Sequence, residues 1–211
     1  DSTTHALIRA RDIIGKKALY LKKCMHGLNK KQLKKPPLHP HDKLNINDWL
    51  FLLGLYTRCG MTVNNGQKET IILSLTNICA VLQRVTTACK NLNLNMTSAK
   101  HRVIIQSHQL RKFTHEFEQD SHKKLPNWCL YMSRVQSLSM LQGLMACPND
   151  NLHKHRHSLT SSSSLLCDDT QILALNSGVA ANITSSNNQN WCITIVPSKF
   201  RQITKNESSV K

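Results

Sequence analysis

The sequence predicts an all-α fold: a disulfide-stapled helical bundle of four to five helices with a long crossover loop and a short C-terminal strand. Apolar residues recur at three- and four-residue steps over most of the chain, as they do on the buried face of a helix. Glycine is scarce, at 7 of 211 residues, which disfavours a fold with many tight turns. Eight cysteines are spread along the chain without a C-x-x-C pair, a layout typical of bridges between packed elements.

The first predicted helix spans residues 5–25 and is followed by a crossover loop over residues 26–47. The loop is basic and rich in proline, and prolines at this density stop a helix. Asn47 or Asp48 then caps a short apolar helix that runs through Tyr56. The apolar face of the first helix is formed by Leu7, Ala10, Ile14, Leu21 and Met25.

Three longer helices are predicted over residues 68–92, 98–122 and 127–147. The last of them lies between Pro126 and Pro148, which suit the start and the end of a helix. The stripe of residues 68–92 is formed by Ile71, Leu75, Ile78, Leu82, Val85, Cys89 and Leu92. The stripe of residues 98–122 is formed by Val103, Leu110, Phe113 and Phe117.

Residues 148–167 are predicted to form a mobile polar loop, because histidine and serine dominate their composition. Asp168 and Asp169 favour the N-terminus of a fifth helix, where negative charge suits the helix dipole. Trp191–Val196 is predicted to be a short strand.

The length of the chain bounds its organisation, since 211 residues can bury one sizeable core. Residues 1–196 are therefore predicted to form a single helical-bundle domain, and residues 197–211 a tail. No apolar run approaches the length of a membrane span. The chain begins at Asp1 rather than Met, which fits a removed signal or transit peptide. No internal repeat is visible.

The cysteines bear on the compartment of the protein. Cys79 and Cys89 are too far apart along one predicted helix to bridge, so any disulfides must join different elements. Such bridges suit an oxidising compartment, and buried thiols in a reducing compartment are the alternative. The cysteines predicted to form disulfides are Cys24, Cys59, Cys79, Cys89, Cys129, Cys147, Cys167 and Cys192.

The net charge of +16 favours a polyanionic partner, although an ordinary basic protein with solvated faces is the alternative. A field of this sign attracts nucleic acid, sulfated glycans or an acidic membrane without choosing among them. Paired lysines in residues 30–35 are typical of heparin-binding and nucleic-acid-binding clusters. The residues predicted to bind polyanions are Lys30, Lys31, Lys34, Lys35, Arg102, Arg111 and Lys112.

No catalytic residue, metal site or cofactor is predicted. The sequence has no G-x-S-x-G, P-loop, G-x-G-x-x-G or H-E-x-x-H motif. Its 12 carboxylates are mostly isolated, which leaves few pairs for acid–base catalysis, so the chain is predicted not to be an enzyme. Asn95, Asn182 and Asn206 begin sequons that would be open to glycosylation in a secreted chain.

The helices over residues 5–147, with the long basic crossover and the distributed cysteines, resemble a long-chain four-helix-bundle cytokine, and the basic, glycosylatable insect cytokines of the Unpaired kind are similar in character. The resemblance implies a secreted signalling glycoprotein that binds a cell-surface receptor. Sulfated glycans would retain it through the lysine cluster. Two alternatives remain open: a basic RNA-associated structural protein, such as an organellar ribosome component, and a nuclear helical scaffold. The alternative localisation is accordingly mitochondrial or nuclear.

Overall fold

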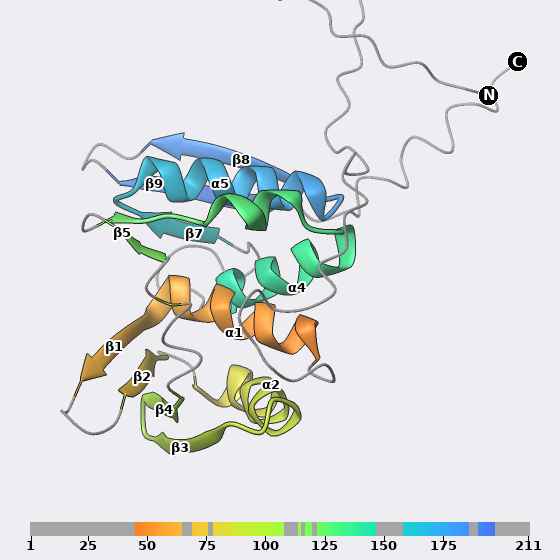
Figure 1. Ribbon diagram of the computed structural model, residues 1–211. Coiled ribbons are helices and arrows are strands. Elements are labelled where there is room, and N and C mark those ends of the chain that lie inside the picture. Colours follow the sequence, from red (N-terminus) through yellow and green to blue (C-terminus); the bar gives the residue numbers. More distant parts are fainter. Residues whose placement is uncertain are drawn as a thin grey trace, which may run out of the picture.

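The computed structural model describes residues 45–64, 69–75, 78–107, 114, 117–119, 122–146, 158–185 and 190–196. Within this part of the chain, helices alternate with strands that form antiparallel sheets (Figure 1). The prediction of an all-α bundle is therefore wrong. The first predicted helix, most of the crossover loop and the tail lie outside the described residues. None of the described helices is both long and apolar enough to cross a membrane.

The first half of the described chain builds a four-stranded sheet, called here the first sheet, in the order β1-β2-β4-β3. One face of this sheet is apolar because alternate residues of a strand point to the same side, and it buries Ile71, Leu73, Val103 and Ile105. The elements of this half are α1 (Ile46–Cys59), β1 (Gly60–Asn64), β2 (Glu69–Ser74), α2 (Ile78–Asn91), β3 (Asn95–Ala99) and β4 (Arg102–Gln106).

The second half builds a three-stranded sheet, called here the second sheet, in the order β7-β9-β8. Leu159, Ile193 and Ile195 make its buried face. A connecting segment precedes this half and contains β5 (Glu118–Gln119), β6 (His122–Lys123) and the 3₁₀ helix η3 (Asn127–Tyr131). The elements of the second half are α4 (Arg134–Met145), β7 (Ser158–Ser161), α5 (Ser164–Asn176), β8 (Ala180–Ser185) and β9 (Trp191–Val196).

The two halves share a common topology, which the sequence does not reveal. In the first half a helix is followed by two strands, a second helix and a hairpin, and in the second half the described elements are a helix, one strand, a second helix and a hairpin. In both halves the last strand lies between its partners. The second helices also end alike, at the left-handed residues Asn93 (φ 52) and Gly178 (φ 78). The next N–H then donates to a carbonyl five residues back, from Leu94 at 2.8 Å and from Val179 at 3.0 Å.

α1 and α4 pack side by side between the two sheets (Figure 1). A Cβ added to Gly54 would clash with the carbonyl oxygen of Met140, and a Cβ added to Gly143 would clash with the carbonyl oxygen of Phe51. The two contacts are reciprocal, because Phe51 and Met140 each lie three positions before the glycine of their own helix. The missing side chains therefore allow the two backbones to touch.

α1 forms the centre of the core, and every residue from Asp48 to Thr57 is buried. The helix is capped by Asn45, whose side chain accepts hydrogen bonds from two backbone N–H groups, so it begins slightly earlier than predicted. The Asp48 carboxylate contacts the Arg84 guanidinium at 2.5 Å and accepts a hydrogen bond from the Asn91 amide at 2.6 Å. These contacts tie α2 to the first turn of α1.

Two predicted helices contain strands. In the predicted helix 68–92, residues 69–74 form β2, and in the predicted helix 98–122, residues 102–106 form β4. Ile71 and Leu75 are four residues apart and fit either structure, but Leu73 between them is also buried, which is the period of a strand.

Among the remaining predictions, residues 158–167 form β7 and the start of α5 instead of a loop. The predicted strand Trp191–Val196 is confirmed as β9.

The predicted disulfides are wrong for every cysteine whose side chain the structure describes. These cysteines, none of them in a disulfide, are Cys59, Cys89, Cys129, Cys167 and Cys192. Burial raises the pKa of the Cys89 thiol and of the Cys167 thiol to about 11, and the Asp168 carboxylate adds to the shift at Cys167. Cys24, Cys147 and the side chain of Cys79 lie outside the described part of the chain.

Candidate functional site

The face of the first sheet that points away from its buried side carries both polar and apolar side chains, and we call it the first outer face. Directly paired residues on neighbouring strands point to the same side of a sheet. Gln106 pairs with Thr70 and with Asn95, and Arg102 pairs with Ser74. The described members of the first outer face are Met61, Val63, Thr70, Ile72, Ser74, Asn95, Thr97, Ala99, Arg102, Ile104 and Gln106.

Long hydrogen-bonding side chains on this face reach solvent. Asn95, Arg102 and Gln106 are all exposed, and together they offer amide and guanidinium groups within one sheet. Between them runs an apolar row in which Ile72 pairs with Ile104, and Met61 at the sheet edge is 50% exposed. The face therefore combines hydrogen-bond donors and acceptors with apolar contacts.

The second sheet has an outer face of shorter side chains, called here the second outer face. These side chains lie opposite the buried Leu159, Ile193 and Ile195. They are mostly hydroxyls, with one amide, and none of the described members is charged. The described members of the second outer face are Ser158, Thr160, Ala180, Asn182, Thr184, Cys192 and Thr194.

The last turn of α1 contacts the second sheet and leads into the first sheet. Arg58 donates a hydrogen bond from Nη1 to the carbonyl oxygen of Thr160 on β7, at 2.9 Å. Two residues later the chain enters β1 of the first sheet. The same turn therefore contacts one sheet and begins the other.

Carboxylates are kept off both outer faces among the described residues. Asp48 is buried in its ion pair with Arg84. Asp168 and Asp169 lie on α5, where Asp169 accepts a hydrogen bond from the Leu125 N–H at 3.0 Å. Burial raises the pKa of Asp169 above its usual value. The two faces are therefore free of the negative charge that would repel a polyanion.

The structure offers no ready metal centre in its described part. No group of three or more histidine, cysteine, aspartate or glutamate side chains there could hold an ion. A metal that acts on phosphate esters is held mainly by carboxylate oxygens, and those described here are dispersed.

The residues predicted from sequence are only partly brought together. Arg102 and Asn95 lie on the first outer face, and Asn182 lies on the second. Gln106, which shares the face of Arg102, was missed because a helix was predicted over residues 98–122; the two-residue alternation of Val103 and Ile105 was the signal. Thr97 lies on the same face, before that predicted helix, in a stretch for which no element was predicted. The predicted site residues outside the described part are Lys30, Lys31, Lys34, Lys35, Arg111, Lys112 and Asn206.

No protein-family model and no curated protein matches the chain, but solved structures do. I-DmoI in complex with DNA and Mn aligns with a TM-score of 0.52 at 13% identity, over 79% of this chain and 99% of that chain. Mesophilic variants of the homing endonuclease I-DmoI align with a TM-score of 0.52 at 12% identity, over 72% and 89%. The chain has the LAGLIDADG fold of the homing endonuclease I-DmoI. The N-terminal LAGLIDADG domain of WhiA aligns with a TM-score of 0.48 at 14% identity, over 82% and 88%.

The LAGLIDADG fold overturns the resemblance to a four-helix-bundle cytokine, which has no place for two sheets on a central helix pair. The predictions of a secreted, receptor-binding glycoprotein held by sulfated glycans depended on the bundle and on its disulfides. Because the bundle and the disulfides are wrong, these predictions are wrong as well. The alternatives, an RNA-associated mitochondrial protein and a nuclear helical scaffold, gain no specific support from this fold.

Proposed function

We propose that this chain binds double-stranded DNA with the outer faces of its two sheets. The observation that carries the proposal is the first outer face, where Asn95, Arg102 and Gln106 are exposed on one sheet and no described side chain is a carboxylate. β-strands are one of the two elements that fit the major groove of B-DNA. I-DmoI, whose fold this chain shares, has been seen in complex with DNA.

The side chains of the first outer face match the chemistry of base edges. Asparagine and glutamine can bond adenine at two points, and arginine can bond guanine in the same way. Apolar side chains such as Met61 and Ile104 suit the methyl group of thymine. The hydroxyls of the second outer face can reach either bases or phosphate oxygens.

The charge of the whole chain supports the same partner. A net charge of +16 attracts the phosphate backbone from a distance and adds a term that falls as salt rises. Among the side chains that the structure describes, the carboxylates are Asp48, which is in an ion pair, and Asp168 and Asp169 on α5. Attraction to phosphate and recognition of bases would then come from different residues.

We infer that binding occurs without strand cleavage, in keeping with the prediction that the chain is not an enzyme. Metal-assisted phosphodiester cleavage depends on carboxylate ligands. α1 ends with Arg58 and Cys59, and Gly60 follows as the first residue of β1. Aligning the two helices on Gly54 and Gly143 gives Cys147, Pro148 and Asn149 as the counterparts after α4. By sequence, neither of these two sets contains an aspartate or a glutamate.

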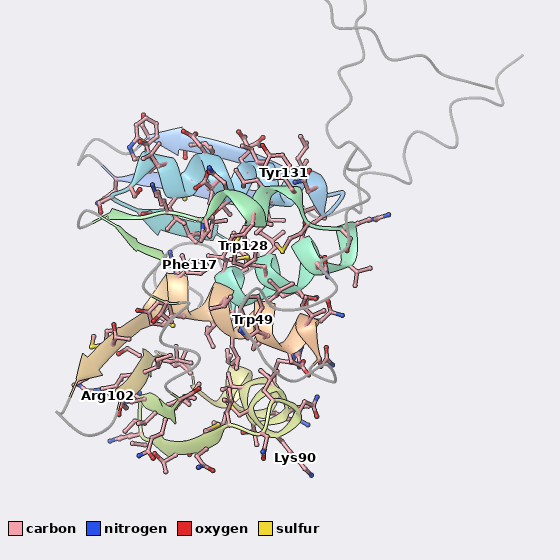
Figure 2. All side chains as sticks on the ribbon, viewed as in Figure 1. Trp49, Lys90, Arg102, Phe117, Trp128 and Tyr131 are labelled. Carbon is pink, nitrogen blue, oxygen red and sulfur yellow. The ribbon has the colours of Figure 1, made fainter. Side chains whose placement is uncertain are left out.

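Binding is tested by selecting sites from a random duplex library and then titrating a selected duplex by fluorescence anisotropy. The double variant Arg102→Ala/Gln106→Ala should weaken binding by about tenfold or more, because each lost base contact costs about 1–3 kcal/mol. The matched control is Lys90→Ala, an exposed lysine on α2 away from the first outer face (Figure 2). Equal losses in both variants, or no duplex binding by the parent chain, would refute the proposed surface.

The absence of cleavage needs its own assay. The selected duplex, incubated with the chain and Mn²⁺ or Mg²⁺ at concentrations that saturate binding, should remain intact on a denaturing gel. Metal-dependent strand breaks at a fixed position would refute the inference that binding occurs without cleavage. They would not contradict the proposed DNA-binding surface.

A further inference from the structure

α4 leaves an apolar stripe uncovered on the side away from α1. Val135 is 61% exposed and Leu138 is 37% exposed, although both are large apolar residues on a helix in the middle of the fold. Beside them lies a groove of about 310 Å³ with walls from α4, the turn after α5 and β9. The groove is lined by Leu138, Leu141, Gln142, Met145, Ala146, Val179 and Ile195.

The repeat shows what this stripe is missing. Aligning α1 with α4 on Gly54 and Gly143 places Trp49 with Leu138 and Tyr56 with Met145. Trp49 is 2% exposed and Tyr56 is fully buried. The positions of α1 that match the uncovered stripe of α4 are therefore covered by other parts of the chain. The two helices otherwise bury matching residues, as Leu55 and Leu144 show.

The cover over α1 comes from the segment that follows the first sheet. Trp128 stacks on Trp49 with 5.7 Å between ring centroids, and Phe117 meets Trp128 edge-on at 6.3 Å. Figure 2 shows these three rings gathered next to α1. Phe117 and Trp128 both belong to the connection between β4, the last strand of the first sheet, and α4.

The equivalent segment in the second half is residues 197–211, which follow β9, the last strand of the second sheet. We propose that this segment docks in the groove on α4, with Phe200 and Ile203 against Leu138 and Met145. Phe200 and Ile203 are three positions apart, a spacing that puts both on one side of a helical turn.

The starting point of the segment favours this occupant over others. Ile195 lines the groove and β9 ends at Val196, so residue 197 begins beside the site that it would cover. Such a short path makes the local concentration of the segment high and the entropic cost of closure small. Covering Leu138 and Val135 would also remove exposed apolar surface from water, which favours docking.

The docking is tested in the full chain by photo-crosslinking. The substitution Leu138→p-benzoylphenylalanine places the probe in the groove, and Val135→p-benzoylphenylalanine repeats the experiment from a more exposed position that tolerates the change. After irradiation and digestion, mass spectrometry should find the probe attached to a peptide from residues 197–211 within a single chain.

The attachment should depend on the two apolar side chains of the segment. The double variant Phe200→Ser/Ile203→Ser should lower the yield about tenfold, because the burial of these groups supplies most of the docking free energy. The matched control Gln202→Ser should leave the yield unchanged. Attachment to residues 5–25, adducts of twice the chain mass, or no attachment from either probe position would each overturn the proposal.

Discussion

Gly54 and Gly143 are matched residues of two central helices, and each lies against the backbone of the other helix. The carbonyl oxygens that they approach belong to Met140 and Phe51, which occupy matched positions as well. The contact therefore has a local two-fold symmetry although both helices belong to one chain.

We expect Gly54→Ala to destabilise the protein. The added methyl group would meet a backbone oxygen that can move only if α1 and α4 separate, and overpacking of this kind costs about 1–3 kcal/mol or more. The free energy of unfolding in urea measures the effect. The control is Gln83→Ala, an exposed position on α2, which should change that free energy by less than about 0.5 kcal/mol.

Arg84→Ala should also destabilise the fold, because it leaves the Asp48 carboxylate buried without its cation. Loss of one partner of a buried ion pair costs about 3–5 kcal/mol, and we expect about 2–3 kcal/mol here, since Arg84 itself reaches solvent. The same variant removes the guanidinium that lies 4.8 Å from the centre of the Phe51 ring. Lys90→Ala, on the same helix, is the control, and an equal loss in both variants would contradict the importance of the pair.

The Asp169→Asn variant should alter how stability depends on pH. Burial raises the pKa of Asp169 in the folded state, so the folded protein favours the neutral form, and the contribution of this group is lost as pH rises from about 3.8 through the raised pKa. Relative to the parent chain, the variant should therefore gain stability from pH 4 to pH 7. Urea unfolding at both pH values measures the difference, and a variant that loses stability over this range would contradict the prediction.

Cys89 and Cys167 should resist alkylation in the folded protein. With a pKa of about 11, each thiol is ionised at pH 7.5 in a fraction on the order of 10⁻³ or less, and burial also blocks the reagent. Mass spectrometry after iodoacetamide treatment should find both unmodified, whereas Cys192, which is half-buried, should react faster. In urea all three should react alike, and rapid labelling of Cys89 in the folded chain would contradict its burial.

Some elements of this fold were readable from the sequence because their local pattern had one interpretation. The run around Leu52 was predicted as a helix and is α1, and the alternation in Trp191–Val196 was predicted as a strand and is β9. β2 and β4 were not predicted. Each of the helical stripes predicted over 68–92 and 98–122 combines apolar residues of a strand with apolar residues of the segment next to that strand. There a period of two and a period of 3.6 share positions such as Ile71 and Leu75.

The repeat was not predicted because the two halves share their backbone geometry but differ in the residue types at matching positions. The left-handed ends of α2 and α5 use Asn93 and Gly178, which both tolerate a positive φ. Arg102 was predicted as a polyanion-binding residue for its charge, and Asn95 and Asn182 were named for their sequons, but none of them was placed on a sheet. Gln106 joins them through strand pairing, which a sequence without a recognised hairpin does not reveal.

The fusion of both halves into one polypeptide bears on the kind of DNA sequence that would be bound. A symmetric dimer presents identical surfaces, so its target is a palindrome. In this chain the first outer face carries Asn95, Arg102 and Gln106, while the second carries short hydroxyl groups such as Thr160 and Thr194. The two half-sites would therefore differ in sequence and in information content, and the protein would occupy its target in one orientation only.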